Sequence, residues 1–215
     1  MKMMLRVFLF MLGLFFMGLG ISLITKSNLG TSPISSVPYE LSLIFPITIG
    51  EFTILLSLLF IIMQMLILRK EFPKEQMLQV FVGPFFGIFI DVGMYLFRFL
   101  NPDYYGDKIL VLLLGCVVLA LGIYFEVAAN VLVNPGEGIV KAIAIKIRKE
   151  FGIIKVIFDA SLFLIAAVIS LTAFGTINGL GVGTIVSALI VGYLIRFYGF
   201  FFKWLISFTP LPALK

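Results

Sequence analysis

Long apolar runs alternate with short polar or charged breaks along the whole chain. A membrane-spanning helix needs about 20 predominantly apolar residues, and six of the runs reach that length, whereas two are too short to cross. The pattern predicts six spans, at about 5–25, 51–68, 77–97, 109–129, 153–172 and 180–200. It also predicts two short helices, at 34–45 and 137–151.

Two of the polar breaks, Asn28–Pro33 and Asn130–Pro135, resemble each other and lie 102 residues apart. At this offset five glycine, asparagine or proline residues match an identical residue, namely Gly13 with Gly115, Gly20 with Gly122, Asn28 with Asn130, Pro33 with Pro135 and Gly50 with Gly152. Chance alignment is the alternative, but weak internal symmetry of this kind is typical of transporter folds. We therefore expect one transmembrane domain, 1–215, made of a first repeat, 5–100, and a second, 107–207.

Composition and charge support a membrane protein with a defined orientation. Hydrophobic residues make up 61% of the chain, charged residues 13%, and the mean hydropathy is +1.18. With six spans and a cytoplasmic N-terminus, thirteen of the 16 Lys and Arg residues fall on the inner side, leaving only Lys26, Arg98 and Lys108 outside. This bias follows the positive-inside rule. Three spans per half place the second half upside down, so the pattern predicts an all-α protein with inverted repeats and both termini cytoplasmic.

Each break ends in a helix start. Proline suits the first helical position because its missing N–H would have no partner there, and Asn134 with Glu137 forms a capping-box pattern. Helix N-termini attract anions and polar groups, so the breaks are candidate sites for a solute. The alternative is a pair of capped turns at the membrane surface. The candidate substrate-binding residues are Asn28, Ser32, Pro33, Asn130, Asn134, Pro135 and Glu137.

Three carboxylates lie within the predicted spans and are candidates for proton or cation coupling. Asp91 has no cation near it in sequence, and Glu126 directly precedes the second break. Asp159 follows Lys155 by four residues, so this pair is expected to neutralise itself on one helix face. Glu51 is assigned to a membrane interface. An ionisable residue inside a membrane is costly and usually functional, which makes Asp91 the leading candidate.

Small residues at helical spacing predict close packing of the third and sixth spans. They are Gly83, Gly87, Gly179, Gly183 and Ser187. The short helix 137–151 carries lysines and an arginine beside an isoleucine face, which suits an interfacial helix. The other short helix has Glu40 as its single charge and is able to dip into the bilayer from outside.

Catalytic and cofactor chemistry find little support. The chain has no histidine and a single cysteine, Cys116, inside an apolar run. It lacks an intramembrane aspartyl protease pattern, a nucleophile elbow, a P-loop and a metal-ligand cluster. We expect no enzymatic activity, no cofactor, no metal and no nucleic-acid partner.

The pattern of glycine, proline and asparagine residues along the chain resembles that of a known family. The run from Gly20 through Asn28–Pro33 to Leu41-Ser42 and Gly50, together with Gly181–Ser187, is similar to the bacterial YczE/YitT-like integral membrane proteins. The resemblance implies a small multi-pass protein of the bacterial plasma membrane. It implies no substrate, since no activity of the family can be transferred.

Two functions are consistent with the sequence. The first is a small secondary transporter, or permease, that moves a small polar or anionic solute past the two breaks. The second is a membrane-embedded substrate-binding or accessory subunit that needs a partner to act. The sequence predicts contact with the lipid bilayer and leaves open whether the protein forms homo-oligomers or binds another protein.

Overall fold

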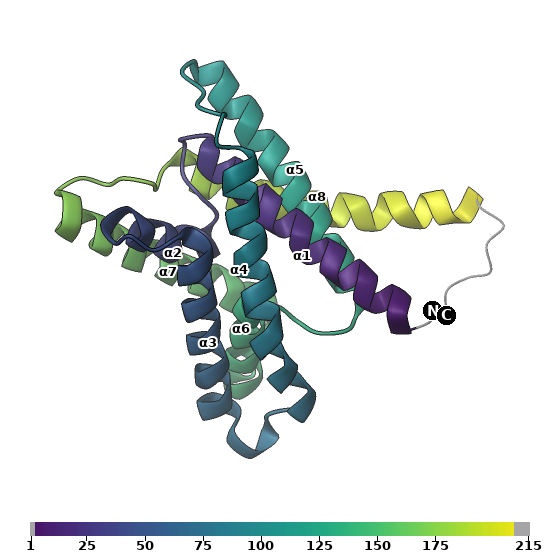
Figure 1. The fold of residues 1–215 in the computed structure, drawn as a ribbon. Coiled ribbons are helices and arrows are strands. Elements are labelled where there is room, and N and C mark those ends of the chain that lie inside the picture. The colour runs from purple at the N-terminus through teal and green to yellow at the C-terminus, as the bar shows by residue number, and fades with distance from the viewer. Residues whose placement is uncertain (1–2, 209–215) are drawn as a thin grey trace.

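The computed structural model describes residues 3–208, and their side chains as far as residue 202. Helices account for every regular element in this range (Figure 1). They are α1 (Met3–Lys26), α2 (Pro33–Ile44), α3 (Ile49–Leu68), η1 (Arg69–Glu71), η2 (Lys74–Leu78), α4 (Gln79–Leu96), α5 (Tyr105–Ala129), α6 (Pro135–Ile147), α7 (Phe151–Phe174) and α8 (Val182–Phe208). Within residues 3–208, six helices are long and apolar enough to cross a membrane, as predicted. The predicted positions of the two chain ends lie outside the described residues.

The antiparallel pair α1 and α5 forms the centre of the molecule (Figure 1). Glycines let the two backbones approach closely. A Cβ on Gly20 would lie 2.5 Å from the backbone nitrogen of Leu119, and one on Gly122 would lie 2.5 Å from that of Met17. Further along the same crossing, Gly13 approaches Glu126 and Gly115 approaches Ile24 in the same way. In lipid, such small residues allow the close contacts that hold helices together.

The remaining spans pack around this pair. Helix α4 lies against α1, α8 lies against α5, and α3 lies against α4. The contact between α3 and α4 is close because Gly50 and Gly87 face each other across it. Gly83 in turn packs on the side chain of Ser57. The predicted packing role of Gly83 and Gly87 thus corresponds to the observed helix pair.

The two short helices pack on spans of the opposite half. Helix α2 lies on α7, and α6 lies on α3. The first part of each is buried among other helices, with Ser36 in α2 and Ile139 in α6 fully inaccessible, whereas the last residues, such as Ile44 and Ile147, are exposed. The sequence favoured a surface position for 137–151, yet most of α6 from Pro135 to Ala144 is buried because glycine and alanine fit tightly beside α3.

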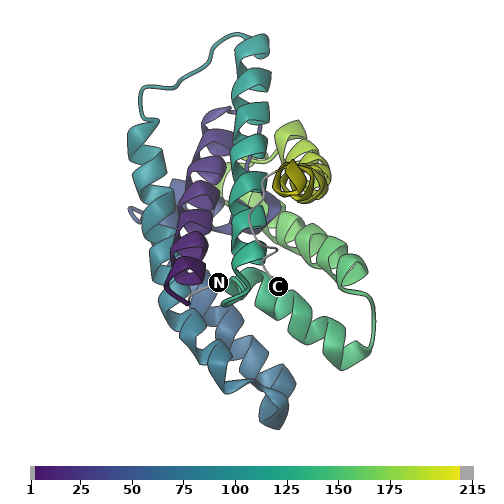
Figure 2. The same cartoon turned by 90° about the vertical axis from the view of Figure 1, so that its right-hand side faces the viewer.

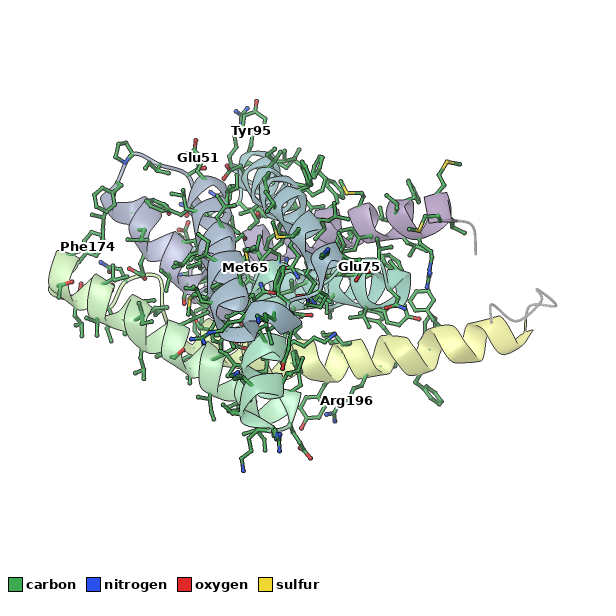
Figure 3. The ribbon with its side chains drawn as sticks, turned by 90° about the horizontal axis from the view of Figure 1, so that it is seen from below. Glu51, Met65, Glu75, Tyr95, Phe174 and Arg196 are labelled. Carbon is green, nitrogen blue, oxygen red and sulfur yellow. The ribbon has the colours of Figure 1, made fainter. Side chains whose placement is uncertain are left out.

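Helix α8 leaves the bundle instead of closing against α7. It runs along α5 and extends away from the rest of the molecule, as Figure 1 and the rotated view in Figure 2 show. In Figure 3, Phe174 marks the far end of α7 on one side, while Arg196 lies on the part of α8 that extends to the other. Within the described residues, the second half therefore lacks the packed helix pair that α3 and α4 form in the first.

Candidate functional site

The beginnings of α2 and α6 meet inside the molecule. Ile34, the second residue of α2, lies directly against Gly136, the second residue of α6. A proline opens each helix, at Pro33 and Pro135, as the sequence predicted. Because the first N–H groups of a helix have no partners within it, two sets of partly positive backbone ends converge at this point.

A cavity of about 1010 Å³ adjoins this meeting point and lies between α7 and α8. Most of its wall is apolar, and its polar lining comes from both helix starts and from the two spans. The polar and charged lining residues are Ser32, Asn134, Glu137, Lys155, Asp159, Thr184, Ser187 and Arg196. Six predicted site or packing residues line it, namely Ser32, Pro33, Asn134, Glu137, Asp159 and Ser187. The cavity thus collects groups from both predicted breaks.

Asn134 is the most constrained of these residues. Its side chain is 3% exposed, and its Oδ1 accepts a hydrogen bond of 3.0 Å from the backbone N–H of Gly136. Its own backbone N–H donates to Glu126 Oε1 at 2.7 Å. Among the described residues, its Nδ2 has no hydrogen-bond partner, and neither has Glu126 Oε2. A buried unpaired donor and a buried unpaired acceptor, each costing about 1–3 kcal/mol, therefore lie beside the cavity.

The predicted capping box at this helix start is only half formed. Asn134 caps α6 as expected, but Glu126, from the end of α5, occupies the position at the Asn134 N–H that Glu137 was expected to take. This frees the Glu137 carboxyl to line the cavity. Burial raises the pKa of Glu137 above 4.5, while the Lys155 ammonium opposes that shift and the Asp159 carboxylate adds to it.

The predicted pair of Lys155 and Asp159 is confirmed. The two side chains are 2.7 Å apart, partly buried, and both line the cavity. Together with Arg196 and Glu137, the lining contains two cationic and two acidic side chains. Such a mixed wall is able to hold a polar solute that carries charge of either sign.

The first break is fastened to the beginning of α8. The N–H of Gly183 donates to the Leu29 carbonyl at 2.8 Å, and the N–H of Thr31 donates to Thr184 Oγ1 at 3.3 Å. Ser32 precedes α2 without capping it, and its hydroxyl donates to Ser35 instead. The first break thus supplies a hydroxyl and backbone groups, whereas the second supplies an amide and a carboxylate.

Three of the predicted binding residues lie away from the cavity. Asn28 and Asn130 end α1 and α5 with left-handed backbones, φ 56° and 46°, a conformation that asparagine tolerates better than most residues. Asn28 contacts Asn101 at 3.4 Å. Pro135 is buried, and its carbonyl accepts from Gln64 Nε2 at 3.3 Å. These residues shape the two breaks.

Asp91 holds together the packed pair α3 and α4. Its carboxylate accepts hydrogen bonds from Thr48 Oγ1 at 2.6 Å and from the N–H of Gly50 at 2.9 Å, so it caps α3 from the neighbouring helix. Thr48 and Glu51 complete a capping box at the same helix start. Asp91 is absent from the cavity lining. Asp91 has no cation near it in the sequence, but N–H and O–H donors from α3 satisfy its carboxylate.

Of the other predicted packing residues, Gly183 lies against Leu29, and Gly179 adopts φ 67° in the turn before α8. Ser187 lines the cavity and donates to the Thr184 carbonyl. Gly83 and Gly87 lie close to α3, in keeping with the close packing expected of the third span, and Gly179 lies close to the side chains of Tyr39 and Glu40.

Several further polar side chains are buried at positions for which the sequence predicts no role. Glu40 is fully buried in α2, and neither of its carboxylate oxygens has a hydrogen-bond partner in the part of the chain that the structure describes. Gln64 and Gln79 are also fully buried and bond to each other at 3.0 Å beside the start of α6. Their signal in the sequence was a lone polar residue within an apolar run. Such a signal does not distinguish a buried from an exposed position.

Comparisons with known proteins agree with the predicted resemblance. A family described as "Family of unknown function (DUF6198)" matches residues 4–199. The uncharacterized membrane protein YczE of Bacillus subtilis (strain 168) is 27% identical over 199 residues, covering 91% of this chain and 86% of that protein. The uncharacterized protein YyaS of the same organism is 29% identical over 114 residues, covering 52% of this chain and 54% of that protein. No solved structure is significantly similar.

Proposed function

The chain belongs to the family DUF6198, and we propose that it is a small secondary transporter built from two inverted repeats. The observation that carries the proposal is the cavity, because both helix starts, one from each half, open onto it. Broken or short helices whose N-termini meet between two repeats are the usual binding site in such transporters. The solute we propose is small and polar or anionic.

The repeat is supported by the crossing of α1 and α5. At the offset of 102, Gly20 of α1 corresponds to Gly122 of α5, and Leu119 of α5 corresponds to Met17 of α1, so the contact between Gly20 and Leu119 maps onto the contact between Gly122 and Met17. The two approaches have the same distance, 2.5 Å. The contact of Gly13 with Glu126 corresponds likewise to that of Gly115 with Ile24, at 2.8 and 2.7 Å. Antiparallel contacts that map onto each other fit a twofold relation between inverted halves.

The short helices fit the same relation. Helix α2 packs on α7 and α6 packs on α3, so each half covers its partner with its short helix. Both begin deep in the protein and end at exposed residues. We propose that they enter the membrane from opposite sides as re-entrant helices. Their backbone can lie at membrane depth because it is buried in protein, as irregular backbone in a membrane requires.

The proposed solute contacts are Asn134 and the polar groups around it. Asn134 Nδ2 is a donor without a partner, and the N–H groups at the start of α2 add positive potential. For coupling to protons or cations we propose Glu126 and Glu137, with Asp159 as their charged neighbour, since all three lie at or beside the cavity. Asp91 is already committed to two hydrogen bonds, which supports a structural role.

A binding screen on the detergent-purified protein tests the proposal. Phosphate, dicarboxylates and amino acids are each added during thermal unfolding, where a ligand at 100 times its Kd stabilises by about 2.7 kcal/mol. Asn134→Asp keeps the capping oxygen but loses the free donor, so it is expected to abolish the shift. Asn130→Gly, outside the cavity, is the matched control. Flux of the stabilising compound into proteoliposomes then establishes transport, and a complete lack of flux would refute it.

An accessory subunit is the second candidate. Of the residues in the apolar stretches of α7 and α8, 17% and 11% are buried within the described part of the chain, which leaves room for a partner. A stoichiometric partner that co-purifies, together with binding but no flux by the isolated protein, would favour this function.

A further inference from the structure

The second half of the molecule has an open helix pair where the first has a closed one. In the first half, Gly50 of α3 lies against Gly87 of α4, and Gly83 lies against Ser57. The residue equivalent to Gly50 at an offset of 102 is Gly152 of α7. A Cβ on Gly152 would meet no described atom within 4 Å. The gap beside Gly152 is the cavity.

The open pair nevertheless retains residues that suit close packing. Helices α4 and α8 align at an offset of 100, where Val82-Gly83 matches Val182-Gly183. At this offset Gly183 is equivalent to Gly83, and Ser187 is equivalent to Gly87. Gly152 and Ser187 both line the cavity, so they face the gap from its two sides. Small residues at a helix surface are expected where another helix approaches closely. In the present arrangement Gly183 packs against the Leu29 backbone, whereas Gly152 has no close neighbour among the described residues.

From this difference between the halves we propose that α8 closes against α7, bringing Ser187 to Gly152 and Gly183 to Asp159 in the arrangement of α3 and α4. The closed arrangement narrows the opening between α7 and α8 and encloses a solute against the starts of α2 and α6. The inference rests on the proposed repeat and supplies the conformational change that the proposed transporter needs.

The contacts that closing exchanges are visible at the start of α8. In the open arrangement, the N–H of Gly183 donates to the Leu29 carbonyl at 2.8 Å, and Thr184 Oγ1 accepts from Thr31. In the first half, Gly83 contacts Ser57, which corresponds to Asp159. Closing therefore moves Gly183 from the first break to α7. Few polar contacts hold α8 at the first break. The positions of α8 against α5 and against α7 can therefore have comparable energies, as an element that moves requires.

Distances between spin labels test the closure without knowledge of the solute. Labels at Ile157 and Ile185 report on α7 and α8, and labels at Leu55 and Phe85 report on α3 and α4. The two pairs correspond through the offsets of 102 and 100, and all four side chains are exposed. Each pair is introduced as cysteines in a Cys116→Ala background, and the protein is measured in lipid nanodiscs across a range of pH.

We expect one narrow distribution for Leu55 and Phe85. For Ile157 and Ile185 we expect two populations. One has a longer distance than that between Leu55 and Phe85, and the other has the same distance as that pair. A single long distance for Ile157 and Ile185, unchanged across the pH range and with phosphate, dicarboxylates or amino acids added, would overturn the closure.

A disulfide provides an independent test. The double variant Gly152→Cys, Ser187→Cys adds little volume to the open structure, because space surrounds Gly152 and a serine differs from a cysteine by one atom. Closure predicts rapid cross-linking under mild oxidation, read by mass spectrometry. The control Gly152→Cys, Phe197→Cys uses an exposed position of α8 outside the cavity lining and is expected to stay reduced. Equal cross-linking of both pairs would indicate undirected motion and contradict the proposed contact. Flux and binding assays test the transporter separately, so either idea can fail alone.

Discussion

Alanine substitutions at Gly50 and Gly152 should have opposite effects on stability, although the two glycines occupy equivalent positions. A Cβ on Gly50 would collide with the Gly87 carbonyl and lie 2.5 Å from Asp91 Cγ. Backbone cannot give way as a flexible side chain does, so α3 and α4 must separate. A Cβ on Gly152 enters open space.

The size of each effect follows from these surroundings. Overpacking costs about 1–3 kcal/mol, and weakening the charged hydrogen bonds to Asp91 adds about 1.5 kcal/mol or more. Alanine recovers at most about 1 kcal/mol over glycine in a helix. Gly50→Ala should thus destabilise by about 2 kcal/mol, whereas Gly152→Ala should stabilise by about 0.5 kcal/mol.

Heating the purified variants in detergent and measuring the remaining monodisperse protein gives an apparent Tm. For a protein of this size, about 2–4 °C accompanies each kcal/mol. Gly50→Ala should therefore lower Tm by about 4–8 °C, and Gly152→Ala should raise it slightly. A similar drop for both variants would refute the reasoning, because it would mean that α7 is as tightly covered as α3.

Three further substitutions separate structural from functional carboxylates. Asp91→Asn should lower stability by about 1–2 kcal/mol through weakened hydrogen bonds to Thr48 and Gly50, while the pH dependence of proteoliposome flux stays unchanged; a changed pH profile would return Asp91 to the coupling mechanism. Glu126→Gln keeps an acceptor for the Asn134 N–H, so we expect near-normal Tm and loss of pH-dependent flux, and retained pH dependence would exclude Glu126. Burial raises the pKa of Glu40. The folded state therefore holds this proton more tightly, and wild-type stability falls as pH rises from 4.5 towards the folded pKa. Glu40→Gln should remove that fall, by about 1.4 kcal/mol for each unit of the shift, and parallel Tm curves for the two proteins against pH would contradict this.

Helix positions followed from the sequence because hydropathy and helix breakers act locally. The predicted spans differ from the observed helices by a few residues at most ends, and the short helix expected from 34 to 45 is α2 at Pro33–Ile44. The pair of Lys155 and Asp159 was also predictable, since residues four apart share a helix face. Each of these features depends on neighbours in the chain.

Features that depend on partners far along the chain were not predictable. The carboxylate that caps the Asn134 N–H comes from Glu126, eight residues before it, although a suitable acid, Glu137, stood at the expected position. Asp91 looked unpaired because its donors lie 43 and 41 residues away. The equal spacing of small residues in α4 and α8 predicted equal packing, yet only α4 is packed in this way.

Residues at equivalent positions of the two halves differ in a way that explains why α7 and α8 are apart. Beneath α4, the first half has Thr53 and Ser57, both buried hydroxyls. At an offset of 102 the second half has Lys155 and Asp159, which form an ion pair beside the cavity. Burying an ion pair costs several kcal/mol per ion unless further hydrogen bonds compensate, whereas a hydroxyl can bond to its own helix, as Thr53 does to the Ile49 carbonyl. Closure in the second half is therefore expensive until a polar solute supplies the missing partners.

Transferring the first-half residues should remove this penalty. The double variant Lys155→Thr, Asp159→Ser gives α7 the two hydroxyl side chains that α3 buries under α4. We expect the population with the short distance between labels at Ile157 and Ile185 to increase severalfold without any added solute. The reverse transfer, Thr53→Lys with Ser57→Asp, should lengthen the distance between labels at Leu55 and Phe85 in the folded fraction. If the first variant leaves the distribution of wild type unchanged, the ion pair does not hold the helices apart, and the cause must lie in the contacts of α8 with the first break.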